Sequence, residues 1–426
     1  MRAGSSSHCR HCSEGLLKPL RILAIGSSGS THVAGRVCCF AERGHHVSLL
    51  TDMVVGLEGV TELTPSAPPG QDQWIATAAR LLGRLVRRDL SGPADMARLM
   101  LDFRRKLRQA DADIVHIHFA YSTWAWMAAA LGARPLVVSI MGGDILFKEQ
   151  GSPTPRGIAL TKQLLGHADL ITSKSNFLIG VLDDLGGYGE KAIRVVWGVD
   201  PEVFKPADGT ALRAAKGIPA EAKVILSPKI LTPFYNIHIL VEAMAKIVAS
   251  VPEAHLVLTE YGADPAYRAQ LERRISELGL TQAVTFVGHV THEQMPAFYS
   301  MADVAVGIPA SDGLPQTLLE AMACGVPSVI GPLDRYGEIV RHEESALLSQ
   351  LDPASLADAV LRLLQNEKLY NHIATRGRTI VEAKANFPRE ADRVEQAYRH
   401  LSAAGKTRYR PRLGILKDVA LYWLRW

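Results

Sequence analysis

The chain has 426 residues, of which 47% are apolar and 21% charged, and its formal net charge is +4. This length exceeds one ordinary domain and this apolar fraction can fill sizeable cores, which excludes a wholly disordered chain. No apolar run is long enough to span a bilayer, and the polar start lacks the apolar core of a secretion signal. We therefore expect a cytoplasmic protein with a disordered extension over residues 1–18.

Short runs rich in Val, Ile and Leu alternate with helical patterns in the first half of the chain. The predicted strands are 21–26, 46–52, 113–118 and 135–140, with a helix over 33–43. Apolar runs of this kind, bounded by Gly and polar residues, are typical of parallel strands covered by helices on both faces.

A polar stretch with Pro and Gly, residues 205–219, interrupts this alternation and is the expected linker. A second series of predicted strands follows it, at 223–227, 255–259, 284–287, 302–306 and 326–330. Two such series predict an α/β protein of two doubly wound domains that face each other across a cleft. The expected boundaries are 19–205 and 206–385 for the domains, 386–403 for a terminal helix and 404–426 for a basic, aromatic tail.

Positive charge is concentrated in residues 76–108 and 406–426, and the rest of the chain is net negative. Between residues 80 and 88, arginines alternate with leucines at helical spacing, which predicts a basic amphipathic helix. Basic and aromatic residues together suit an anionic membrane surface, but a solvated helix and a packed tail explain them equally well. A nucleic-acid partner is not expected, because no recognition motif accompanies the charge.

The five cysteines are few and odd in number, which favours free thiols in a reducing compartment. Cys9 and Cys12 form a CxxC pair, but no second pair completes a zinc site, so we expect no metal.

Three features of the first half follow predicted strands and would face the cleft. A glycine-rich loop around Gly29 opens a helix and can bring backbone amides to a phosphate. Ser28 occupies the third position of the dinucleotide fingerprint, where a glycine is required, which disfavours a nicotinamide cofactor. His118 ends a strand, and Asp144 follows a turn of two glycines. A structural histidine and a turn-capping aspartate are the alternative interpretations.

The most informative motif is residues 311–327, Ser-Asp-Gly-Leu-Pro-Gln-Thr-Leu-Leu-Glu-Ala-Met-Ala-Cys-Gly-Val-Pro. A helix is expected to begin near Pro315, a residue type favoured in the first turn. The first-turn amides that would then be free to bind phosphate are those of Gln316, Thr317 and Leu318. Asp312 can accept hydroxyl groups of a sugar, and Glu320 can accept two hydroxyl groups of a ribose.

This motif resembles that of the retaining family 4 glycosyltransferases of the GT-B fold, and the resemblance extends over roughly residues 21–400. That family carries an acid, seven residues and then Glu-Ala-Met-Ala-x-Gly-x-Pro, a spacing that Asp312 and Glu320 match. Further similar segments are the strand 115–118, the stretches 168–173 and 197–206, and the element 336–340.

Asp312 stands where the family more often has Glu, and the chain departs from the family pattern at four further positions. Lys229 stands where the family has a phosphate-binding Arg, and Tyr235 where it has a Lys, so one cation of the diphosphate clamp is missing. Lys174 or Arg335 are the basic residues that could compensate. Met141 replaces a frequent His, and Trp197 replaces a common Asn.

The resemblance implies transfer of a sugar from a UDP- or GDP-linked donor to a glycan or lipid-linked acceptor, with retention of anomeric configuration and without a cofactor. It also implies site roles. Lys229 and the amides of residues 316–318 stabilise the departing diphosphate, and Gly29 and Gly313 line the same site. His118, Asp312 and Glu338 hold the sugar, Glu320 holds the ribose, and Asp144 orients the acceptor.

In the family the terminal helix crosses back onto the first domain, which is the acceptor side. The basic helix over 80–88 lies in that domain, which favours a lipid-linked acceptor and a peripheral position on the inner face of the membrane.

Two other classes of function stay open. A nucleotide-sugar-binding subunit without transfer activity is suggested by Lys229 and Tyr235, whereas Asp312 and Glu320 argue against it. An epimerase or phosphorylase of the same fold is the third interpretation, although no cofactor-binding lysine motif supports it.

Overall fold

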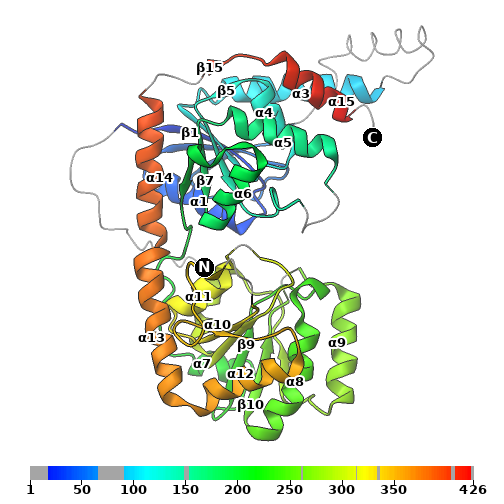
Figure 1. Ribbon diagram of the computed structural model, residues 1–426, viewed down its shortest axis with the longest axis vertical. Helices are drawn as coiled ribbons and strands as arrows, with labels where there is room; N and C mark the ends of the chain where they lie inside the picture. Colours follow the sequence, from blue (N-terminus) through cyan, green and yellow to red (C-terminus); the bar gives the residue numbers. More distant parts are fainter. Residues whose placement is uncertain are drawn as a thin grey trace, which may run out of the picture.

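The computed structural model describes residues 18–65, 91–147, 153–260, 262–312, 314–332, 336–403 and 408–423. Two α/β domains lie next to each other and are connected along one side by two successive helices, α13 (Glu367–Lys384) and α14 (Phe387–Ser402) (Figure 1). The architecture confirms the predicted fold class of two parallel-sheet domains.

The N-terminal domain is built on a parallel seven-stranded sheet in the order β3-β2-β1-β4-β6-β7-β8. Its strands are β1 (Arg21–Ile25), β2 (His46–Leu50), β3 (Val60–Leu63), β4 (Ile114–His118), β6 (Leu136–Ile140), β7 (Leu170–Ser173) and β8 (Ala192–Arg194). Its helices are α1 (Thr31–Glu42), α3 (Ser91–Gln109), α4 (Thr123–Ala130), α5 (Pro155–His167) and α6 (Asn176–Gly186), with a short 3-10 helix η1 (Gly189–Lys191). Every residue of β4 and β6 is buried, as expected for apolar strands covered on both faces.

The C-terminal domain repeats this plan with a parallel six-stranded sheet in the order β11-β10-β9-β12-β13-β14. Its strands are β9 (Lys223–Ser227), β10 (Ala254–Leu258), β11 (Val284–Phe286), β12 (Val304–Gly307), β13 (Ser328–Ile330) and β14 (Leu347–Leu348). Its helices besides α13 are α7 (Thr210–Ala215), η2 (Pro233–Tyr235), α8 (Ile237–Ser250), α9 (Pro265–Glu277), η3 (His292–Gln294), α10 (Met295–Ser300), α11 (Gln316–Ala323) and α12 (Pro353–Gln365).

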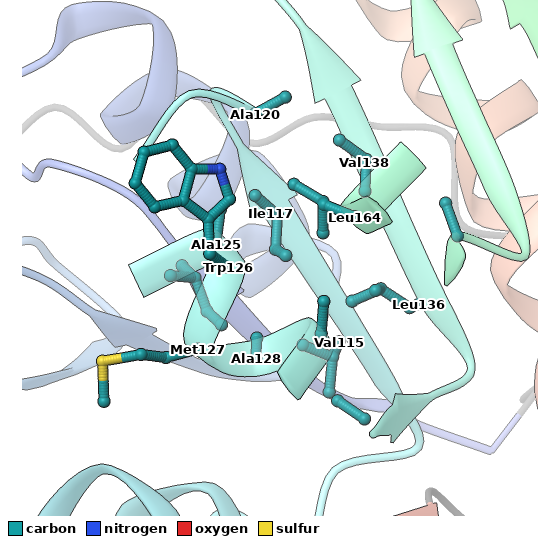
Figure 2. Packing of buried hydrophobic residues seen from close by; sticks show 14 of the residues in the cluster. Val115, Ile117, Ala120, Ala125, Trp126, Met127, Ala128, Leu136, Val138 and Leu164 are labelled. Carbon is teal, nitrogen blue, oxygen red and sulfur yellow. The ribbon is translucent and has the colours of Figure 1, made fainter. Parts of the chain in front are cut away.

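The N-terminal core is centred on Trp126 of α4, one of the largest fully buried side chains. Figure 2 shows it above Ile117 of β4 and close to Leu164 of α5. Its indole Nε1 donates to Thr161 Oγ1 at 3.1 Å, so the polar atom of this buried ring is satisfied. Dense packing of α4 and α5 on the sheet fixes the carboxyl ends of its strands, where the candidate site lies.

The chain crosses between the domains twice, and the two crossings lie side by side. Val199 N donates to Ala385 O at 3.0 Å, and Phe387 N donates to Val199 O at 3.0 Å. A Cβ at Gly198 would lie 1.6 Å from Ala385 O, so only glycine permits this approach. The expected linker 205–219 instead contains α7, where Arg213 pairs with Asp303 at 2.9 Å and so belongs to the C-terminal domain.

After the second crossing, α14 packs on the N-terminal domain. Ala391, Val394 and Tyr398 are buried in its core. The tail follows as a two-residue strand β15 (Arg408–Tyr409), paired antiparallel with β5 (Ala133–Arg134), and helix α15 (Leu413–Trp423). In α15, Ile415 and Val419 join the core around Trp126. This packing supports the packed-tail interpretation for these residues.

Three sequence-based expectations lie outside the described residues: the extension before Lys18, the basic amphipathic helix over 80–88 and the Cys9–Cys12 pair. Within the described ranges, no helix combines the length and the apolar character that a membrane crossing requires. Cys38, Cys39 and Cys324 are free thiols.

Candidate active site

The candidate site lies at the junction of the domains, where loops after several parallel strands meet. Lys229 follows β9, Asp312 lies between β12 and α11, and Lys174 follows β7. The residues that line a pocket in the C-terminal part of this junction are Pro228, Lys229, Ala305, Val306, Gly307, Pro315, Thr317, Leu318, Ser328 and Ile330. This is the edge at which parallel α/β sheets bind their ligands.

Lys229 is a buried cation with one close acid. Its exposed fraction is 7%, and its Nζ lies 3.8 Å from Asp312 Oδ2 and 5.7 Å from the centre of the Tyr235 ring. Burial lowers the pKa of Lys229, while the charges of Asp312 and Glu320 oppose that shift. A Cβ at Gly307 would lie 2.7 Å from Lys229 Cε, so the glycine leaves room for the lysine. The result is a positive group held at the pocket wall.

The N-terminus of α11 faces the same pocket without a capping side chain. Pro315 occupies the cap position. The amide of Leu318 donates to Pro315 O at 3.2 Å, so it is engaged within the first turn. The expectation of three free amides is therefore reduced to those of Gln316 and Thr317, which point along the helix axis as first-turn amides do. These amides and Lys229 together can bind a phosphate group.

Glu320 is buried on α11, and both of its oxygens already have partners. Tyr299 Oη donates to Oε2 at 2.8 Å, and His292 Nε2 lies 3.2 Å from Oε1. The hydrogen bond to Glu320 raises the pKa of His292, against the effect of burial. A ribose at Glu320 would therefore share the carboxylate with His292 and Tyr299. Neither residue carried a sequence signal, because each lies outside the 311–327 motif.

Lys174 brings a second cation to Asp312 and Lys229 from the other domain. Its Nζ donates to Leu314 O at 3.2 Å, across the domain junction. Burial lowers the pKa of Lys174; the charge of Asp312 opposes the shift, whereas Arg36 and Lys229 add to it. Of the two residues expected to replace the missing clamp lysine, Lys174 lies at the site, and Arg335 lies outside the described residues.

The two histidines of β4 have different environments. His116 contacts Tyr398 Oη of α14 and lies 2.8 Å from Ser139 Oγ through its Nε2, which is a structural arrangement. His118 is 4% exposed, its ring centre lies 4.1 Å from that of His116, and its Nδ1 lies 3.5 Å from an Arg36 nitrogen. Burial, with the charges of His116 and Arg36, lowers the pKa of His118 far enough to keep it neutral near pH 7. Neutral His118 can donate or accept one hydrogen bond.

Asp144 differs from the expectation that it contacts the acceptor. It is fully buried, and its carboxylate accepts backbone hydrogen bonds from Ala120 at 2.7 Å and from Met141 and Gly142 at 2.9 Å each. These bonds hold the turns after β4 and β6 in place. An acid enclosed by amides is not free to bind a hydroxyl group, so the geometry corresponds to the turn-capping alternative.

Glu338 also differs from its expected role at the sugar. Its Oε1 accepts from the amide of Phe177 at 3.1 Å, and its Oε2 lies 3.1 Å from Arg194 Nε. Both partners belong to the N-terminal domain, so in this arrangement Glu338 joins the two domains. A sugar could reach this carboxylate only if these contacts opened.

Two hydrogen bonds of Ser28 hold the glycine-rich loop against the segment after β2. The amide of Ser28 donates to Thr51 Oγ1 at 2.9 Å, and its hydroxyl donates to Met53 O at 2.6 Å. A Cβ at Gly29 would lie 3.1 Å from Met53 Sδ, so this loop packs closely on the segment after β2. Gly313 lies outside the described residues. Among the residues that are described, no three acids, cysteines or histidines gather as a metal site would require.

Two family models match the chain, one in each domain. Residues 29–196 match the glycosyl transferase 4-like domain, and residues 208–380 match the glycosyl transferases group 1. Together they span most of both sheets.

Curated proteins and a solved structure are also similar. The N-acetyl-alpha-D-glucosaminyl L-malate synthase of Bacillus anthracis is 25% identical over 311 residues, 72% of this chain and 79% of that protein. The D-inositol 3-phosphate glycosyltransferase 2 of Catenulispora acidiphila is 27% identical over 370 residues, 79% of this chain and 83% of that protein. The crystal structure of Anabaena HepE with UDP and glucose has a TM-score of 0.71 at 20% identity, covering 89% of this chain and 99% of that one.

Proposed function

Since the chain belongs to the group 1 glycosyltransferases with a GT-B fold, we propose that it moves a sugar from a nucleotide-sugar donor to a glycan or lipid-linked acceptor with retention of anomeric configuration. The donor nucleotide is UDP or GDP, and no metal or other cofactor takes part. The acceptor binds on the side of the N-terminal domain, at the cytoplasmic face of an anionic membrane.

The observation that carries this proposal is the pairing of a buried cation with an open helix N-terminus at one pocket. Lys229 and Thr317 line the same pocket, and Gln316 and Thr317 are the first two residues of α11. A leaving diphosphate develops negative charge as the glycosidic bond breaks, and preorganised positive groups stabilise that charge. The pocket supports diphosphate departure as the step that the protein accelerates.

A second cation supports the same step. Lys174 comes from the N-terminal domain and contacts the loop that carries Asp312 and Leu314. We propose that it replaces the clamp lysine absent at Tyr235, so that the diphosphate is bound by one lysine from each domain. The clamp is then complete only when the domains are close, which would couple the reaction to domain closure.

The remaining residues are proposed to position the substrates. Asp312 and His118 accept and donate hydrogen bonds to the transferred sugar, and Glu320 binds the ribose together with His292. Asp144 acts as a positioning residue, since its contacts fix the turns on either side of His118. Gly29 and Gly313 line the donor site, and Glu338 exchanges its domain contacts for the sugar when the donor enters.

The experiment that tests the proposal is a ligand screen by thermal unfolding with UDP, GDP, ADP, their common sugar conjugates and NAD. UDP comes first, because HepE was crystallised with it. A ligand at ~100 times its Kd stabilises by ~2.7 kcal/mol, which is a measurable shift. We expect one nucleotide to shift the wild-type protein, and Glu320→Ala to lose that shift.

Turnover then separates an enzyme from a binding subunit. With the donor so identified, Lys229→Ala should lower kcat/KM by about 10²–10³, because it removes one charge-stabilising group. Lys368→Ala is the matched control, since Lys368 is exposed on α13. Anomeric proton couplings of the product report retention. Donor binding without turnover across a broad acceptor set would instead identify a nucleotide-sugar-binding subunit, and a shift with NAD alone would contradict the proposal.

A further inference from the structure

Arg36, on α1, is the most buried arginine in the part of the chain that the structure describes. Its exposed fraction is 5%. One guanidinium nitrogen lies 3.5 Å from His118 Nδ1 and 3.5 Å from Met141 Sδ, and the guanidinium carbon lies 4.7 Å from the centre of the Trp197 ring. Within the described ranges, no carboxylate lies within ion-pairing distance of it. Arg36 is thus a buried cation without a counter-ion.

Such an arrangement is unfavourable unless something compensates for the charge. A buried guanidinium loses its hydration, and an aromatic ring or a sulfur atom does not replace an anion. Burial lowers the pKa of Arg36 to about 9, so the group stays charged at neutral pH. Asp144 attracts it only from a distance, because three backbone amides already hold that carboxylate.

The position of Arg36 is that of a ligand group. His118 ends β4, Met141 follows β6, and Trp197 follows β8, so all three contacts lie at the sheet edge that faces the other domain. Positive charge extends from there, because Lys174 of the same domain also reaches the junction, where its Nζ donates to Leu314 O at 3.2 Å. The N-terminal side of the junction therefore attracts anions.

This positive group is separate from the donor diphosphate clamp. Lys229 contacts Asp312 and Tyr235 of the C-terminal domain. Arg36 instead contacts His118, Met141 and Trp197. Burial lowers the pKa of Lys174, and the charges of both Arg36 and Lys229 lower it further. The donor and a second anion can therefore occupy the junction at once.

We propose that the acceptor carries an oxyanion group, a carboxylate or a phosphate, and that Arg36 is the residue that binds it. This inference rests on the proposed function, which places the acceptor on the N-terminal side. A guanidinium binds either oxyanion through two parallel hydrogen bonds. In the complex, the bound oxyanion would be the counter-ion that Arg36 lacks in the free protein. Neutral His118 beside it would then contact the sugar rather than the anion.

The test uses the full chain with saturating UDP, which fills the donor clamp. Inorganic phosphate or malonate is then titrated at constant ionic strength, balanced with chloride, and followed by thermal unfolding and calorimetry. We expect both anions to stabilise the wild-type complex further, and Arg36→Met to weaken their apparent affinity by about tenfold or more. Arg376→Met, at an exposed arginine of α13, is the matched control and should bind them as the wild type does.

Two further measurements separate binding from a structural role. Without ligands, Arg36→Met should unfold at the same temperature as the wild type or higher, because it removes an unpaired buried charge. Arg36→Lys keeps the charge but loses the planar fork, and should bind the anions more weakly than the wild type. A stabilisation by phosphate and malonate that persists in Arg36→Met would overturn the inference, as would a large loss of stability in the free variant. Absence of the UDP shift in the wild type would count against the proposed function itself.

Discussion

At the scale of single residues, the junction is organised by buried charges whose partners come from distant parts of the chain. Glu320 is the clearest example, because its carboxylate receives Tyr299 from α10 and His292 from η3. The side chain of His292 is 48% exposed, so this ion pair lies at the rim of the buried site. The His292 imidazole can therefore exchange its proton with the solvent.

The pairing of His292 with Glu320 predicts a pH-dependent stability. Since the pair raises the pKa of His292 in the folded state, its stabilisation is fully present below the unfolded-state pKa of ~6.5 and is lost as the pH rises through the raised value. The unfolding temperature of His292→Gln should therefore fall furthest below that of the wild type near pH ~6, and the gap should narrow at higher pH. His372→Gln, at an exposed histidine of α13, is the control. A gap of constant size from acid to alkaline pH would contradict the assignment.

The sequence located Asp312 and Glu320 in one continuous motif and Lys229 in a separate segment, and the structure places Lys229 beside Asp312. Lys229 and Asp312 lie 3.8 Å apart although they are far apart in the chain. The sequence could not show which groups already bind the carboxylates of the predicted acids. Asp144 and Glu338 were expected to bind substrates, yet backbone amides and Arg194 engage them. The contacts of Glu338 depend on how loops meet across the domain junction, which no local pattern encodes. Those of Asp144 lie within the N-terminal domain and correspond to the turn-capping alternative.

At the scale of elements, the two crossings form a narrow connection between rigid sheets. The segment after β8 and the segment between α13 and α14 are joined by backbone hydrogen bonds at Val199. The Gln316 side chain of α11 donates to Gly198 O at 2.7 Å, so the first turn of this helix contacts the same connection. Movement of the domains would therefore also move the N-terminus of α11.

Gly198→Ala should disturb this connection. The added methyl group would meet Ala385 O at 1.6 Å, which neither backbone can avoid without losing the hydrogen bonds at Val199. We expect a loss of about 2 kcal/mol or more in the free energy of unfolding, measured by chemical denaturation, and a reduced kcat/KM.

Gly180→Ala provides the matched control for that variant. Gly180 lies within α6 with no atom within 4 Å of its added Cβ. Alanine there should stabilise by about 0.5–1 kcal/mol through helix propensity. If Gly198→Ala and Gly180→Ala were equally stable, the close approach of Gly198 to Ala385 would not contribute to stability.

At the scale of the whole molecule, the N-terminal domain is assembled from both ends of the described chain. Helix α14 crosses from one domain to the other, and α15 lies against the upper domain near α3 and α5 (Figure 1). The sequence predicted the two sheets and most of their strands, because apolar runs mark buried parallel strands. It left the tail undecided between a membrane surface and packing, since aromatic and basic residues suit both. The contact of Tyr422 with Trp126, at 5.0 Å between ring centres, supports packing for the described part of α15.

A chain that ends at Ala403 should lose much of the stability of the N-terminal domain. It would lack Ile415 and Val419, which are buried in the core around Trp126, and would expose the apolar surfaces of α4 and α5. Each large apolar side chain removed costs ~1.5–3 kcal/mol of burial. We expect a lower calorimetric unfolding temperature and faster hydrogen exchange in β4 and β6, with UDP still bound. A chain ending at Trp423 is the control, and an unchanged unfolding temperature in the shorter chain would refute the role of α15.

Because α14 and α15 pack on the N-terminal domain, the order of synthesis also determines which domain can complete its folding first. The C-terminal domain consists of one continuous stretch ending with α13, so it can be complete as soon as that helix leaves the ribosome. The N-terminal domain is synthesised first but must wait for Tyr398 and Val419 to close its surface. The apolar surface that these residues cover therefore stays exposed while the other half of the chain is synthesised.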